Sequence, residues 1–190
     1  MNKDLTENTV FEKTDFTHTQ LAQGAYEACT FTNCNFYSAD ISNIIFRECV
    51  FNGCDLSLIK MKNTVFNDVC FLNCKLMGAR FDFCKQFLLS VRFENCVLKL
   101  TSFYKLKLRK TLFIHCTLHE ADFTQSDLSG AVFNNCDLQR AIFEETNLEK
   151  VDFTTSYNYT FYPEKNHIKK ARFSASCIGG LLVKYDILIE

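Results

Sequence analysis

Residues 111–153 read TLFIHCTLHEADFTQSDLSGAVFNNCDLQRAIFEETNLEKVDF, and one five-residue unit repeats through the whole stretch. The third residue of each unit alternates between Phe and Leu, from Phe113 to Phe153, and the first residue is small or of modest size. Neither a helix of 3.6 residues per turn nor a strand with a repeat of two uses its side chains in this way. A period of five requires a backbone that turns a corner every five residues. The stretch therefore predicts an all-β solenoid of stacked square coils, with one large and one small residue of each unit inside.

The same repeat begins near Phe11, holds one register to Phe81, and resumes at Phe93 displaced by two residues. If four units form one coil, residues twenty apart lie about 4.8 Å above one another, as in any parallel ladder. An insertion of two residues keeps two columns intact, which a three-residue deletion would break: Phe11, Phe31, Phe51, Phe71, Phe93, Phe113, Phe133 and Phe153, and Thr14, Cys34, Cys54, Cys74, Cys96, Cys116, Cys136 and Ser156. We therefore predict a bulged corner within residues 82–87, with Leu88 returning to the core.

The repeat pattern predicts one β-helix domain at residues 1–173, of which the last coil, 154–173, is degenerate. Pro163 cannot donate to a ladder, which suits a corner or loop at this end. Residues 174–190 differ in character, and we expect a short helix over 175–185 followed by an extended ILIE segment.

The end of a solenoid exposes unpaired backbone and apolar side chains, so it needs a cap or a partner. The apolar residues of the tail could fold back on their own chain or pair with the same segment of a second molecule: Leu181, Leu182, Tyr185, Ile187 and Ile189. The residues alone leave both possibilities open.

Composition indicates a single soluble domain: 190 residues with a formal net charge of −1. The polar start MNKDLTENTV lacks the apolar core of a signal peptide, and no apolar run is long enough for a spanning helix. The charge offers no bulk reason for nucleic-acid or membrane binding. We expect a cytoplasmic protein that binds neither nucleic acid nor a membrane directly.

The 11 cysteines mostly occupy the small inward position of the repeat. Free Cys packs as a small hydrophobe, and buried thiols are typical of a reducing compartment. Equivalent thiols in a continuing row do not converge on one point as zinc ligands must, and disulfides would pair the row into strained bridges. We expect reduced thiols without metal.

The motifs of catalysis are absent: the sequence has no Gly-rich phosphate loop, no nucleophile elbow and no HExxH. His115 and His119 would form a ligand pair on a helix, but here they lie at outward positions of neighbouring units. We therefore predict a protein without enzymatic activity, cofactor or metal.

Surface charge is the remaining clue to function. Two bases, Arg140 and Lys150, interrupt an acidic run that follows a basic patch of Lys99, Lys105, Lys107, Arg109 and Lys110. The acidic residues form either an ordinary solvated surface or a functional strip that meets a basic groove on a partner: Glu120, Asp122, Asp127, Asp137, Glu144, Glu145, Glu149 and Asp152.

The units CDLQR, SDLSG, TNLEK and ADFTQ closely resemble the A(D/N)Lxx motif of the pentapeptide repeat family, and the resemblance extends over residues 11–153. It implies a right-handed quadrilateral parallel β-helix with four units per coil. The length, the single frame break and the tail GLLVKYDILIE are similar to the Qnr, MfpA and McbG type.

That resemblance implies a tail that joins two chains end to end. It also implies a protein that imitates duplex DNA, binds DNA gyrase or topoisomerase IV, and protects these enzymes from quinolones or toxins. A protein-interaction scaffold with a different partner is the alternative hypothesis.

Overall fold

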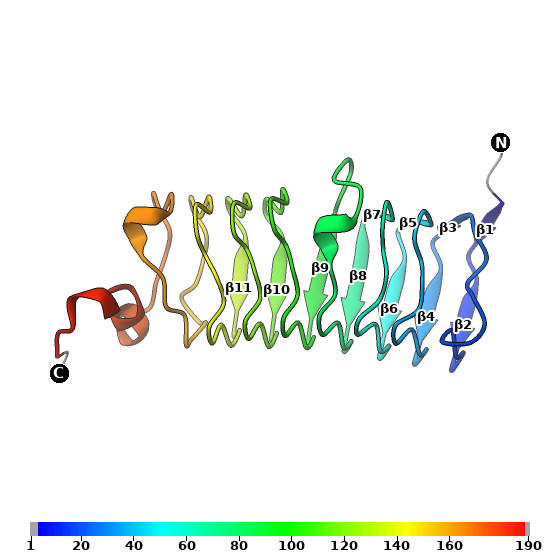
Figure 1. Ribbon diagram of the computed structural model, residues 1–190, viewed down its shortest axis with the longest axis horizontal. Helices are drawn as coiled ribbons and strands as arrows, with labels where there is room; N and C mark the ends of the chain where they lie inside the picture. Colours follow the sequence, from blue (N-terminus) through cyan, green and yellow to red (C-terminus); the bar gives the residue numbers. More distant parts are fainter. Residues whose placement is uncertain (1–3, 189–190) are drawn as a thin grey trace.

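Because each unit turns the chain by one corner, successive coils stack into a straight four-sided rod. The computed structural model describes residues 4–188, and β1 (Leu5–Glu7) lies at the opposite end of the rod from the C-terminal segment (Figure 1). The predicted quadrilateral parallel β-helix is confirmed.

Two of the four faces carry regular strands. The first face holds the seven-stranded parallel sheet β2-β4-β6-β8-β9-β10-β11: Val10–Glu12, Thr30–Thr32, Val50–Asn52, Val69–Leu72, Val91–Glu94, Leu112–Ile114 and Val132–Asn134. The fourth face holds the four-stranded parallel sheet β1-β3-β5-β7: Leu5–Glu7, Ala25–Glu27, Ile45–Arg47 and Val65–Asn67. The other two faces are the second, around Leu56 and Leu118, and the third, around Met61 and Phe123. On each of them, successive coils are joined by isolated parallel bridges, such as Asp55↔Lys75 on the second face and Asp122↔Ile142 on the third.

The register between coils confirms the two-residue insertion. Phe31 pairs with Phe51, a spacing of twenty, whereas Phe71 pairs with Phe93 across the frame break. The first-face sheet therefore runs unbroken through the insertion.

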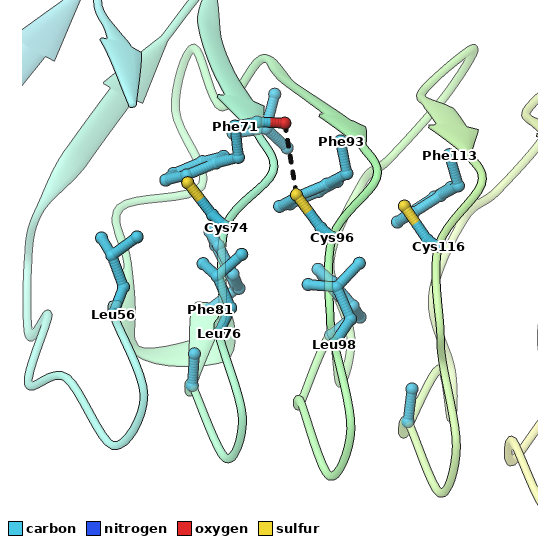
Figure 2. Packing of buried hydrophobic residues seen from close by; sticks show 14 of the residues in the cluster. Leu56, Phe71, Cys74, Leu76, Phe81, Phe93, Cys96, Leu98, Phe113 and Cys116 are labelled. Carbon is cyan, nitrogen blue, oxygen red and sulfur yellow. Dashed lines mark hydrogen bonds between the residues drawn. The ribbon is translucent and has the colours of Figure 1, made fainter. Parts of the chain in front are cut away.

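The core is a column of stacked Phe rings, and part of it appears in Figure 2, where Phe71, Phe93 and Phe113 follow one another from left to right on successive coils. The Phe93 and Phe113 ring centroids are 5.3 Å apart with an interplanar angle of 10°, and Phe113 and Phe133 are 4.7 Å apart at 2°. Rings of the column on the opposite face, such as Phe103, meet them edge-on, at 81° to Phe113. This packing explains why the sequence is rich in Phe.

The inward cysteines donate hydrogen bonds in addition to filling space in the core. All 11 thiols are free, and Sγ of Cys96 lies 3.3 Å from the carbonyl oxygen of Phe71 in the preceding coil (Figure 2). Cys136 makes the same contact with Phe113 at 3.3 Å, and the Thr146 hydroxyl bonds to the Phe123 carbonyl at 2.9 Å. The inward position therefore selects small side chains, Ala among them, and these Cys and Thr residues add a hydrogen bond to the preceding coil. Burial also raises the pKa of the Cys49 thiol to about 11.

The expected return of Leu88 to the core was wrong. A 3-10 helix, η1 (Phe81–Phe83), continues the third face, and the chain then protrudes as a loop between β8 and β9 (Figure 1). Lys85 and Ser90 still donate to the preceding coil, so the extra residues lie between them. Leu88 is 57% exposed with a φ of 64°, and Leu89 packs against the core instead. The fourth-face sheet ends at β7 because this loop replaces its next strand.

The last coil closes in distorted form. Phe173 stacks on Phe153 with centroids 5.5 Å apart, and Pro163 opens the 3-10 helix η2 (Pro163–Lys165). The tail forms two 3-10 helices, η3 (Ala175–Leu181) and η4 (Val183–Tyr185). The expected extended segment begins at residues 187 and 188, which form no strand, and its last two residues lie outside the described part of the chain.

Candidate functional site

The coil distributes the acidic residues over all four sides of the rod, because each successive unit lies on the next face. Asp152 projects from the first face, Asp137 from the second, and Asp127 and Glu149 from the fourth. The remaining four lie together on the C-terminal half of the third face and its two corners: Glu120, Asp122, Glu144 and Glu145. We call these four the third-face acidic cluster.

The Asp at the second position of a unit also has a local role in the corner. Its Oδ1 accepts the backbone N–H two residues later, at 2.9 Å in Asp152 and 3.1 Å in Asp127. Burial alone would raise the pKa of Asp127, but hydrogen bonds from Arg109 and Ser129 outweigh it and hold the pKa below its usual range. The Asp or Asn at the second position of the motif therefore has a structural role at the corner of the coil.

Ion pairs between neighbouring coils neutralise several of the carboxylates outside this cluster. Asp127 lies 2.6 Å from Arg109 Nε, and Asp152 lies 2.8 Å from Arg172 Nη1. His119 Nε2 lies 2.7 Å from Asp137 Oδ2, a contact that sequence spacing did not reveal. Within the cluster, Glu144 pairs with Lys165 at 2.5 Å.

The basic patch is divided between faces as well. Lys107 and Arg109 project from the fourth face, whereas Lys99 lies on the second. Lys105, at a corner of the third face, places its Nζ 4.8 Å from the ring centroid of Tyr104. Acidic and basic groups are therefore mixed on the same faces of the rod.

The C-terminal end presents apolar surface of two kinds. Leu181 is buried against the last coil and caps its own chain, and Leu182 is half-buried. Tyr185 and Ile187 are 58% and 55% exposed, and Ile189 lies outside the described residues. Beside them, Tyr159, Cys177 and Val183 help to line a hollow of about 370 Å³.

Within residues 4–188, no group of three or more His, Cys, Asp or Glu side chains is placed to hold a metal ion. In the same part of the chain, no helix has the length and apolar character needed to cross a membrane.

The family model described as "Pentapeptide repeat region" matches residues 25–86 and 87–161. No curated protein matches the chain by sequence. Among solved structures, a trypsin-treated form of QnrB1, described as a plasmid-mediated fluoroquinolone resistance protein, superposes with a TM-score of 0.64 at 18% identity, covering 98% of this chain and 100% of that one. Full-length QnrB1 gives a TM-score of 0.51 at 19% identity, covering 97% and 100%. At these identities the likeness shows the fold.

Proposed function

The chain belongs to the pentapeptide repeat family, and on that premise we propose that it is a non-enzymatic binding protein whose partner is a type II topoisomerase, DNA gyrase or topoisomerase IV. The observation that carries the proposal is the end-to-end match to QnrB1, a fluoroquinolone resistance protein, over 98% of this chain. By the same analogy, binding protects the topoisomerase from fluoroquinolones.

The third-face acidic cluster is the surface proposed to meet a DNA-binding groove of the enzyme. Asp122 and Glu145 have no ion pair among the described residues, and Glu145 accepts a hydrogen bond from Gln125 at 2.6 Å. Carboxylates on a straight, narrow rod are complementary to a groove built for phosphates.

We also assign the C-terminal end to self-association, which would place two rods end to end. Exposed Tyr185 and Ile187 supply apolar area at the tip, while Leu181 stays in its own chain. Sedimentation should give a dimer for the unmodified protein and a monomer for Tyr185→Asp. A monomer for both would refute this assignment.

A supercoiling assay tests the topoisomerase proposal. Protein added to gyrase of the same organism should restore supercoiling inhibited by a fluoroquinolone, and Glu145→Lys combined with Asp122→Lys should weaken that rescue. The matched control is Glu48→Lys, because Glu48 has the same corner conformation as Glu145, with φ of 53° against 52°. No effect at micromolar excess, or equal rescue by both variants, would refute the proposal.

An interaction scaffold for a different partner is the second candidate. It is favoured by the mixed surface charge, since Arg109 and Lys107 lie on the face beside the acidic cluster. A pull-down from native lysate that enriches another protein and no topoisomerase would support this candidate instead.

A further inference from the structure

A groove lies on the third face, on the N-terminal side of the acidic cluster. Its main hollow, of about 440 Å³, is lined by three successive coils: Asp40 and Ser42, then 58–62, then Gly78, Arg80 and Phe83. We call it the third-face groove. Its two walls stand at the two corners that border the face, with Leu58 on one side and Phe83 on the other.

The walls are apolar where the corners of this rod are commonly polar. Leu58 is 50% exposed and Phe83 is 52% exposed, so neither side chain is used to fill the core. Leu58 also has a φ of 55°, a conformation that a bulky residue adopts at a cost. At Gly78, an added Cβ would lie 2.8 Å from Leu58 Cδ2, so the missing side chain of Gly78 leaves room for the side chain of Leu58.

The groove continues toward the C-terminal end. A second hollow, of about 420 Å³, shares Arg80 with the first and is lined by Leu100, Ser102, Tyr104 and Asp122. Leu100 repeats the features of Leu58, with a φ of 59° and 56% exposure. Two exposed leucines in the same strained corner position therefore border the same face.

The floor of the main hollow is basic. Lys60 and Lys62 form no ion pair with any residue of the described chain, and only Asp40 faces them in the lining. Arg80 is held by Asp82 through contacts of 2.9 and 2.6 Å, and its guanidinium carbon lies 4.3 Å from the centroid of the Phe83 ring. The hollow thus combines apolar walls with an excess of positive charge, since Asp40 is the single carboxylate in a lining that holds Lys60, Lys62 and Arg80.

We infer that the third-face groove binds an acidic peptide segment of a partner protein. An apolar side chain of that segment enters between Leu58 and Phe83, and its carboxylates face Lys60 and Lys62. Charge complementarity selects an acidic ligand, and the hollow between two apolar walls can take a large apolar side chain. The inference concerns the main hollow, whose lining includes no residue of the acidic cluster, and it holds whichever protein supplies the segment.

Selection from a display library of random twelve-residue peptides, on the full-length protein, tests the inference without a known partner. Selected peptides should be enriched in Asp and Glu around Phe, Tyr or Leu. Their affinity, measured by fluorescence anisotropy, should fall at least tenfold for Leu58→Asn and for Lys62→Glu, and should weaken as salt is added.

Two variants serve as matched controls. Leu88→Asn replaces an exposed leucine with a φ of 64°, and Asn tolerates this conformation at both leucine positions. Lys75→Glu makes the same charge reversal on the second face. Both controls should bind as tightly as the unmodified protein. Selected peptides without acidic residues, or equal affinity for Leu58→Asn and Leu88→Asn, would overturn the inference.

Discussion

Truncation of Phe113 measures how much the stacked Phe column contributes to stability. The ring is fully buried, stacked on Phe93 and Phe133 at 5.3 and 4.7 Å, and edge-on to Phe103 and Phe123 at 5.8 and 5.9 Å. Truncating a buried Phe to Ala costs about 3–5 kcal/mol. The ring has aromatic neighbours in both adjoining coils, each worth about 0.5–1.5 kcal/mol beyond burial. We therefore expect Phe113→Ala to lose about 4–5 kcal/mol, near the upper end of that range.

The same substitution at the end of the column provides the comparison. Phe11 is partly exposed, and within residues 4–188 the one ring stacked on it is that of Phe31, at 4.8 Å. With roughly half the packing, Phe11→Ala should cost about 2 kcal/mol. Leu112, in the same strand as Phe113 but 36% exposed, is the surface control, and Leu112→Ala should change stability by less than about 0.5 kcal/mol.

Urea unfolding followed by circular dichroism supplies the free energies. Neighbouring coils of a solenoid can unfold separately, so the slope of the transition must match between variants before the free energies of unfolding are compared. Equal losses for Phe113→Ala and Phe11→Ala, or a loss below about 2 kcal/mol at Phe113, would refute the argument from two-sided stacking.

Three further outcomes follow from the coil. Cys136→Ser should cost less than about 1 kcal/mol, because a hydroxyl can donate to the Phe113 carbonyl as the thiol does, whereas Cys136→Asp should cost several kcal/mol more by burying an unpaired charge. Thiol titration of denatured, unreduced protein should find all 11 cysteines, and far fewer would contradict the free-thiol structure. The pKa values of Asp127, Asp137 and Asp152 are lowered because hydrogen bonds outweigh burial, so their contribution is complete above the unfolded pKa of about 3.9 and is lost as pH falls below it. The urea concentration at the midpoint of unfolding should therefore fall when the pH is lowered below about 4, and it should fall less for Asp152→Asn. Equal acid sensitivity of this variant and the unmodified protein would contradict this.

The interior of the rod could be predicted from the sequence because a five-residue repeat fits only one path of the backbone. The columns through Phe113 and Cys136 required four units per coil and a two-residue insertion, and the pairing of Phe71 with Phe93 has that register. The insertion itself could not be placed to the residue. Leu88 and Leu89 are equally apolar, and only the path of the loop decides that Leu89 contacts the core.

The outside of the rod was much less predictable, because closeness along the chain does not mean closeness on the surface. Residues five apart lie on adjacent faces, so an acidic run in the sequence becomes a ring around the rod. The useful relation is the spacing of twenty, which brings Asp152 beside Arg172 and Glu145 beside Gln125. The third-face groove was missed for the same reason, since Leu58 and Phe83 come from corners of different coils.

The coil spacing also limits how negative one face of such a rod can be. Identical charges twenty residues apart would lie about 4.8 Å apart, where they repel one another. This chain instead places Glu120 below Arg140, Asp122 below Ile142 and Glu145 below Lys165. The residues of the third-face acidic cluster accordingly spread across the face and its two corners, within two coils, and not along the length of the rod. A partner that recognises it would therefore contact a short patch of the rod, and the basic groove on the same face is free to hold a second, acidic element.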